Sequence, residues 1–287
     1  FLENVQTYQS YWSISWNIFK KNKVAMVCLF IVILLCLIAL FAPLIAPYDP
    51  NKQVLTDRLM KPCGQHWFGT DDLGRDIFSR IIYGCRVSLS VGIISQIIAT
   101  VIGYTMGVCA GYYGGKVDSV ISFLIQVFSS FPFLLFAMAI MFVLGPGLIN
   151  LYLALGLLGW ASTARLIRGD VMRLKKMEYI DACKVSGGNS FRIIMKHLLP
   201  NCLSTLIVTV TLGIPNAIMS EASLSFLGLG VKAPMASWGS MISFSQPYIR
   251  SATYYSVIPG LAIIITVLAF NMLGDGLRDA LDPKLRS

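Results

Sequence analysis

The chain has few charged residues, and this scarcity defines its class. Only 13% of its 287 residues are Asp, Glu, Lys or Arg, whereas 56% are hydrophobic and the mean hydropathy is +0.70. A soluble domain of this length cannot bury so much apolar surface, so part of the surface must face lipid. The net charge of +9 does not indicate nucleic-acid binding, because the cations lie in loops beside apolar segments.

Histidines and paired cysteines are equally scarce. Only His66 and His197 are present, and the seven cysteines are scattered with no CxxC pair. Neither a disulfide framework nor a zinc site is supported by this pattern. With so few histidines, we also expect no histidine-based catalytic centre and no metal site.

Catalytic and nucleotide-binding motifs are missing as well. No Walker sequence, GxSxG elbow or HExxH pair occurs. The segment 111–116 looks like a phosphate loop, but Ala110 occupies the place of its first glycine, and Val117 replaces the Ser or Thr that would hold magnesium. We therefore predict that the chain is not an enzyme and binds no cofactor of its own.

Long apolar segments, in contrast, are abundant. Six of them are long enough to cross a bilayer as helices: 24–46, 87–110, 117–144, 148–164, 203–222 and 256–273. The first is too long for a signal-peptide core, so we expect it to be retained. The pattern predicts an all-α integral membrane protein with six transmembrane helices. Pro132 and Pro215 should kink the third and the fifth of them.

The positions of Lys and Arg orient these spans. With the N-terminus inside, 15 of the 23 basic residues face the cytoplasm and eight face outward, which satisfies the positive-inside rule. An even number of spans then places both termini in the cytoplasm. The predicted parts are an N-terminal interfacial helix (1–23), a first span (24–46), an outer segment (47–86), a five-helix core (87–276) and a tail (277–287). The core contains one inner loop (165–201) and one outer loop (223–255).

Two short patterns concern helix packing. Tyr8, Trp12, Trp16 and Phe19 recur at helical spacing, which predicts a helix lying in the membrane interface; a disordered tail is the alternative. In the second span, glycines at four-residue spacing let another helix approach closely. They mark either a gating helix at a pore or ordinary bundle packing: Gly103, Gly107 and Gly111.

One long polar segment, 168–201, separates two of the apolar stretches. It contains seven Lys or Arg residues against three Asp or Glu residues, and this excess places it in the cytoplasm. Its centre, 178–192, is expected to form one or two short helices broken at Gly187 and Gly188. Loops of this length in compact proteins are usually functional, and a soluble partner can reach this one.

Ionisable residues within the spans are sparse. Glu221, near the end of the fifth span, is the best candidate for a group that lines a pathway, because intramembrane ionisable residues often do so. The alternative is that it lies at the outer boundary and caps local backbone. Pro132 and Pro215 are the other pathway candidates. A proton-coupled carrier should show a relay of buried carboxylates, which this sequence lacks.

The polar segment resembles the EAA motif of the permease subunits of ATP-binding cassette (ABC) importers. Asp181-Ala182-Cys183 takes the place of the Glu-Ala-Ala triplet, Gly187 that of the glycine, and Leu199-Pro200 that of the final Leu-Pro. Asp, Cys and His197 depart from the Glu, Ala and Ile of the motif. Three further segments resemble the dipeptide, oligopeptide and nickel permease family, in its C-type subunit: 66–89, 225–239 and 269–286.

This resemblance implies a type I ABC importer permease fold and a set of partners. They are a homologous second permease subunit, two cytoplasmic ATPases that bind ATP and Mg, and an extracytoplasmic solute-binding protein, all at a bacterial or archaeal cell membrane. Segment 178–189 would be the coupling helix that meets an ATPase. The residues expected to couple to the ATPase are Glu178, Asp181, Ala182, Cys183, Ser186, Gly187 and Gly188.

The function predicted on this basis is a permease subunit that forms half of a translocation pore for di- or oligopeptides. A nickel or metal-chelate importer is the alternative within the family. A self-sufficient secondary carrier is the alternative from another class. Matched broken helices in an inverted repeat would favour such a carrier, and none is apparent.

Overall fold

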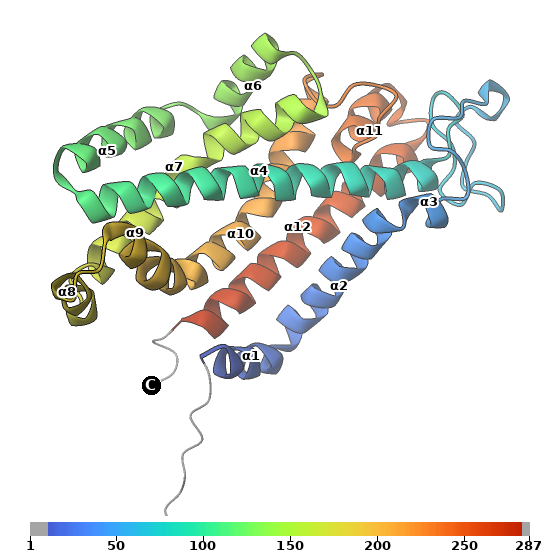
Figure 1. The fold of residues 1–287 in the computed structure, drawn as a ribbon. Helices are drawn as coiled ribbons and strands as arrows, with labels where there is room; N and C mark the ends of the chain where they lie inside the picture. Colours follow the sequence, from blue (N-terminus) through green and yellow to red (C-terminus); the bar gives the residue numbers. More distant parts are fainter. Residues whose placement is uncertain (1–10, 283–287) are drawn as a thin grey trace, which may run out of the picture.

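The computed structural model describes residues 11–282 as a bundle of helices (Figure 1). Within this range there is no β-strand, only an isolated bridge between Thr70 and Asp76. The all-α prediction is therefore confirmed for the described residues. Tyr8, Lys284 and Arg286, on which parts of the interfacial-helix and topology predictions rest, lie outside them.

Most of the helices follow one another with short connections, except between α3 and α4 and between α10 and α11. In chain order they are α1 (Tyr11–Lys21), α2 (Lys23–Leu40), α3 (Ala42–Ile45), η1 (Leu55–Asp57), α4 (Ile77–Tyr113), α5 (Gly115–Ser130), α6 (Phe133–Leu144), α7 (Leu148–Leu174), α8 (Glu178–Val185), α9 (Ser190–Ile193), the π-helical turn η2 (Ile194–Leu198), α10 (Leu199–Phe226), α11 (Trp238–Ser245), η3 (Gln246–Tyr248) and α12 (Thr253–Leu281).

Four helical stretches in the described chain are long and apolar enough to cross a membrane: 23–40, 77–113, 190–226 and 253–281. The bent pair α5 and α6 makes a fifth if it counts as one span. The prediction of several membrane spans is thus confirmed, but the number six is not. Helix α7 is not among the candidates; its C-terminal part carries four charged residues, namely Arg165, Arg168, Asp170 and Arg173.

Regular helix continues beyond three of the predicted apolar spans. Helix α4 begins at Ile77, ten residues before the predicted span and within the predicted outer segment. Helix α7 continues to Leu174, so the predicted inner loop starts as helix. Helix α12 ends at Leu281, inside the predicted tail.

The predicted third span, 117–144, is not one kinked helix. Helices α5 and α6 meet at an angle of 90°, with Phe131 in an extended conformation between them. Pro132 precedes the first turn of α6 and lies outside the regular helix. Proline disfavours helical backbone in the residue before it, which explains why Phe131 ends α5 and why the chain turns instead of bending.

The long helices α4 and α7 pack along much of their length, and their glycines permit it. An added Cβ would lie 2.6 Å from Thr163 Cβ at Gly103, 2.7 Å from the Ala164 carbonyl oxygen at Gly107, and 2.8 Å from Val171 Cβ at Gly111. The close packing predicted from this spacing is confirmed. Helices α2 and α12 lie side by side on the other flank of the bundle (Figure 1).

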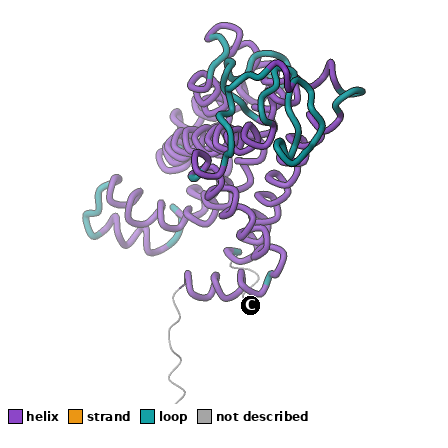
Figure 2. The backbone as a smooth tube through the Cα atoms, turned by 90° about the vertical axis from the view of Figure 1, so that its right-hand side faces the viewer, coloured by secondary structure: helices purple, strands orange, loops and turns teal. Residues whose placement is uncertain are grey.

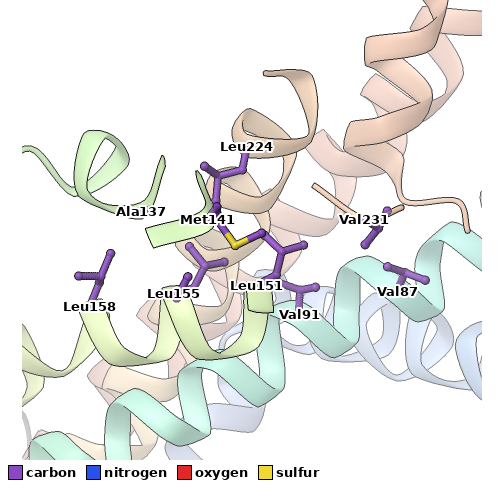
Figure 3. Packing of buried hydrophobic residues seen from close by; sticks show 10 residues of the cluster. Val87, Val91, Ala137, Met141, Leu151, Leu155, Leu158, Leu224 and Val231 are labelled. Atoms are coloured by element: carbon purple, nitrogen blue, oxygen red, sulfur yellow. The ribbon is translucent and has the colours of Figure 1, made fainter. Parts of the chain in front are cut away.

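A cluster of buried apolar side chains joins α4, α6, α7 and α10 (Figure 3). Met141 of α6 points between Leu151 of α7 and Leu224 of α10, and all three are fully buried. Helix α6, although set at a right angle to α5, is thereby fixed to the rest of the bundle.

Most of the non-helical chain lies at one end of the bundle (Figure 2). There, Asp71 is completely buried and accepts a hydrogen bond of 2.6 Å from Arg75 Nε, while Arg80 Nε lies 3.5 Å from the same carboxylate. Arg80 also donates to the Pro50 carbonyl oxygen at 3.0 Å. Buried charges are stable only when they are paired in this way, so the pairs fix segment 47–76 onto the start of α4.

Candidate functional site

Helix α8 and the turn that follows it project from the end of the bundle opposite to the loop-rich end (Figure 1). The helix is followed by Gly187 with φ +81°, a backbone conformation that residues with a Cβ rarely adopt. Asn189 then caps α9, its side-chain oxygen accepting the Arg192 amide at 2.8 Å. The prediction of one or two short helices broken at Gly187 and Gly188 is confirmed, and there are two, α8 and α9.

Helix α8 is fixed to the bundle through one face. Ile180 is completely buried, and Cys183 is half-buried beside it in an apolar cluster. The cluster brings α8 together with α4, α7, α9 and α10, through Val108, Ile167, Val171, Leu174, Ile193, Leu198, Cys202 and Leu206. The cluster therefore fixes α8 to the ends of three long helices, α4, α7 and α10.

The opposite face of α8 is exposed. Val185 is 90% exposed and Phe191, just beyond the turn, is 73% exposed. Asp181 accepts a hydrogen bond of 2.8 Å from Lys184 Nζ, which raises the pKa of that lysine. Most of the residues predicted to couple to an ATPase are on this exposed surface: Glu178, Asp181, Ala182, Ser186 and Gly187.

Cys183 and Gly188 behave differently from the other predicted coupling residues. The Gly188 amide donates to the Cys183 carbonyl oxygen at 2.9 Å, and a Cβ at Gly188 would lie only 2.6 Å from Cys183 Sγ. These two residues therefore shape the turn itself, while the others form its surface.

Two cations connect the region before α8 to the turn between α4 and α5. Lys175 Nζ donates to the Gly111 carbonyl oxygen at 2.6 Å, and Arg168 Nη2 donates to Asp118 Oδ2 at 2.7 Å. A cation at a helix C-terminus is favourable, since the last carbonyl groups carry partial negative charge. Sequence reasoning missed this connection, because the partners lie 64 and 50 residues apart.

A cavity of about 1530 Å³ lies against α10. Its wall includes small polar residues at intervals along α10, and their hydroxyls mostly donate to carbonyl oxygens of their own helix, as Thr209, Ser220 and Ser223 do at 2.7 to 2.9 Å. The charged lining residues are Asp170, Arg173, Arg278 and Asp282, toward the α8 end. Among the described lining residues, none is charged in the remainder of the cavity.

The three predicted pathway residues lie beside this cavity and are not among its lining residues. Pro215 is buried inside α10, and Pro132 lies between Phe131 and Phe133, which do line the cavity. Glu221 is completely buried among hydroxyl groups on the face of α10 away from the cavity. A direct contact with substrate stays a prediction for all three.

The fold has features that are typical of a membrane transport protein: several helices long and apolar enough to cross a membrane, an exposed short helix after a basic segment, and a large cavity between helices. Residues 100–287 match the family "binding-protein-dependent transport system inner membrane component", and residues 10–62 match the N-terminal membrane domain of oligopeptide transport permease C. The chain belongs to this family of ABC importer permeases. It is a membrane permease subunit and not an enzyme.

Relatives are similar over nearly the whole chain. The dipeptide transport system permease protein of Bacillus subtilis (strain 168) is 46% identical over 96% of this chain and 87% of its own length. The oligopeptide transport system permease protein of the same organism is 42% identical over 96% and 91%. The glutathione transport system permease protein of Pectobacterium atrosepticum is 42% identical over 96% and 92%.

A solved structure shares the fold. It is an inward-facing form of the MetNI methionine ABC transporter, 19% identical, which covers 72% of this chain and 98% of its own with a TM-score of 0.58. The resemblance stated from the EAA-like segment and the three other segments is thus confirmed at the level of the family and of the type I importer permease fold.

Proposed function

We propose that this chain forms half of a translocation pathway for di- or oligopeptides in an ATP-driven importer, together with a homologous second permease. The cavity carries this proposal. Peptides of different sequence share only their backbone and termini, so a carrier for them needs hydrogen-bonding groups without a fixed charge that would select one side chain. Uncharged polar side chains along α10 supply such groups, chiefly as acceptors, among the apolar residues of the wall, and about 1530 Å³ exceeds the roughly 300–1,000 Å³ of small-molecule pockets.

The names of the relatives support the same substrate class. They are permeases for dipeptides, for oligopeptides and for glutathione, which is itself a small peptide. Partners follow from the class of transporter. We place two ATP-binding subunits that use ATP and Mg beneath the chain, and an extracytoplasmic solute-binding protein above it.

The geometry of α8 supports its role as the coupling helix of the same assembly. Its buried face carries Ile180, while the exposed Val185 and Phe191 are apolar groups suited to a groove in an ATPase. Closure of the ATPases on ATP would displace α8, and the packed cluster behind Ile180 would carry the displacement to α4, α7 and α10. Alternating access of the cavity would result.

Uptake by the reconstituted complex tests the proposed function. The chain would be purified from its native membrane with its bound subunits, reconstituted with its own binding protein and supplied with ATP. We expect accumulation of labelled di- and tripeptides and stimulation of ATP hydrolysis by peptide-loaded binding protein. Accumulation of labelled nickel, with neither response to a peptide library, would instead establish the metal importer.

The proposed topology has six spans, with α7 and the α5–α6 pair each counted as one and with both ends of the chain in the cytoplasm. Its test is a cysteine at the exposed Asn51, in a background in which the exposed Cys63 is serine. In intact cells we expect a membrane-impermeant thiol reagent to label it. A cysteine at Lys176, beside α8, is the matched control and should react only after the membrane is opened. Labelling at position 176 in intact cells, and at position 51 only after the membrane is opened, would show that the topology is the inverse of the proposed one.

A further inference from the structure

The carboxylate of Glu221 lies in an enclosed cluster of three serine hydroxyls. It is completely buried within the described structure. Oε1 accepts hydrogen bonds from Ser225 Oγ at 2.6 Å and Ser237 Oγ at 2.7 Å, and Oε2 faces Ser88 Oγ at 3.4 Å. All three partners are neutral hydroxyls. Burying a carboxylate without a cation costs free energy, and these hydrogen bonds must offset that cost.

The three hydroxyls come from different parts of the fold. Ser88 is in α4, Ser225 is one turn beyond Glu221 in α10, and Ser237 precedes the first turn of α11. We name these four residues the distal brace, because they lie at the end of α10 that is far from α8. The brace therefore joins α10 and α11 to α4, whose Ser88 precedes Glu221 by 133 residues.

Each hydroxyl of the brace outside α10 is also an acceptor. Ser237 Oγ accepts the Ser240 amide at 3.1 Å, which caps α11, and Ser88 Oγ lies 3.3 Å from the Trp238 amide, which donates to it. The Trp238 indole in turn donates to the Ile81 carbonyl oxygen of α4 at 3.1 Å. Glu221 thus orients hydroxyls that themselves hold the start of α11 on α4.

The connection between α10 and α11 lies directly on the brace. A Cβ at Gly230 would lie 1.9 Å from Ser225 Oγ, and one at Gly239 would lie 2.5 Å from Ala222 Cα. On the neighbouring face of α10, Ser220 and Ser223 line the cavity. Glu221 is therefore behind the cavity wall, where it joins that wall to residues 227–237 and to α11.

We propose that Glu221 is a positioning residue of the transporter, which holds segment 227–237 and α11 against α4 and α10 so that the distal cavity wall moves as one unit. The link to transport rests on the proposed function, whereas the structural role does not. The hydrogen-bond pattern requires an acceptor at Oε1. It does not require a negative charge, because a glutamine carbonyl would accept from Ser225 and Ser237, and its amide would donate to Ser88.

Hydrogen exchange in the purified complex, read by mass spectrometry over residues 227–245, tests the structural role. We expect Glu221→Ala to speed exchange there by about tenfold or more, because buried hydroxyls lose their acceptor. Glu221→Gln should exchange as the unchanged protein does. Ser223→Ala is the matched control, since Ser223 is on the same helix turn but donates only to the Met219 carbonyl oxygen.

Peptide uptake by the two Glu221 variants tests the link to transport. We expect uptake to fall about fivefold or more in Glu221→Ala and to return in Glu221→Gln, with basal ATP hydrolysis unchanged in both. If Glu221→Ala fails to assemble, Ser237→Ala carries the same comparison with a smaller effect. Unchanged exchange in both Glu221→Ala and Ser237→Ala would overturn the proposal. So would a Glu221→Gln complex that exchanges normally and does not transport, since the charge would then act on the pathway. The exchange experiment tests the structural role of Glu221 even if the complex with the unchanged chain transports no peptide.

Discussion

Replacement of Gly187 by proline is expected to abolish transport while the protein remains in the membrane. Gly187 has φ +81°, whereas proline is fixed near −65°. Its amide also donates to the Lys184 carbonyl oxygen at 3.0 Å, which proline cannot do. The turn after α8 must therefore rearrange, and the exposed Val185 and Phe191 lose their relative positions. The membrane helices do not depend on this turn, so insertion should continue.

The measurement is peptide uptake by the reconstituted complex, with the amount of chain in the membrane determined in parallel. Gly169→Ala is the matched control, because a Cβ there meets no atom within 4 Å and α7 continues through it. That variant should transport normally. Normal uptake by Gly187→Pro would exclude the turn from coupling.

A second variant separates contact with the ATPase from the shape of the turn. Val185 is 90% exposed and contributes little to the fold, so Val185→Glu should leave the chain intact. It should weaken association with the ATPase subunits, because a charge would replace an apolar contact in a groove. Loss of ATPase from the purified Val185→Glu complex would identify α8 as the contact surface. Retention of the ATPase in that complex would show that the contact with the ATPase lies elsewhere.

Local sequence patterns predicted those features that depend on local physics. The apolar runs identified α2, α10 and α12 because lipid requires about twenty apolar residues in a row. The glycine spacing in α4 predicted its close contact with α7, and the Gly187-Gly188 pair predicted the break after α8. In each case the determining residues are neighbours in the chain.

Features that depend on distant residues were not predictable. The buried pairs of Asp71 with Arg75 and Arg80 need the folded outer segment, in which polar residues look like an ordinary loop until they are enclosed. The surroundings of Glu221 depend on hydroxyls 133 and 16 residues away. Helix ends were not predictable either, since hydropathy records where an apolar run ends and not where a helix ends.

Gly107→Leu is expected to prevent stable folding of the bundle. A Cβ at this position would lie 2.7 Å from the Ala164 carbonyl oxygen and 2.8 Å from Ile167 Cβ, and neither the backbone nor a branched β-carbon can move aside. Helices α4 and α7 would have to separate along their length. We expect a loss of about 3 kcal/mol or more in stability, at the upper end of overpacking costs. Thermal unfolding in detergent, followed by size-exclusion chromatography, measures it.

The comparison of two further variants decides between the two roles that the glycine spacing permits. Val101→Leu is the control, because Val101 is 60% exposed on the same helix and faces away from this contact. Gly107→Ala adds only the Cβ and should reduce stability by an intermediate amount. If the three glycines serve packing alone, uptake by Gly107→Ala should follow the amount of folded complex. If α4 also slides against α7 during gating, uptake should fall further than the folded fraction does. If Gly107→Leu is as stable as the unchanged chain, then α4 and α7 do not approach each other as closely as in this structure.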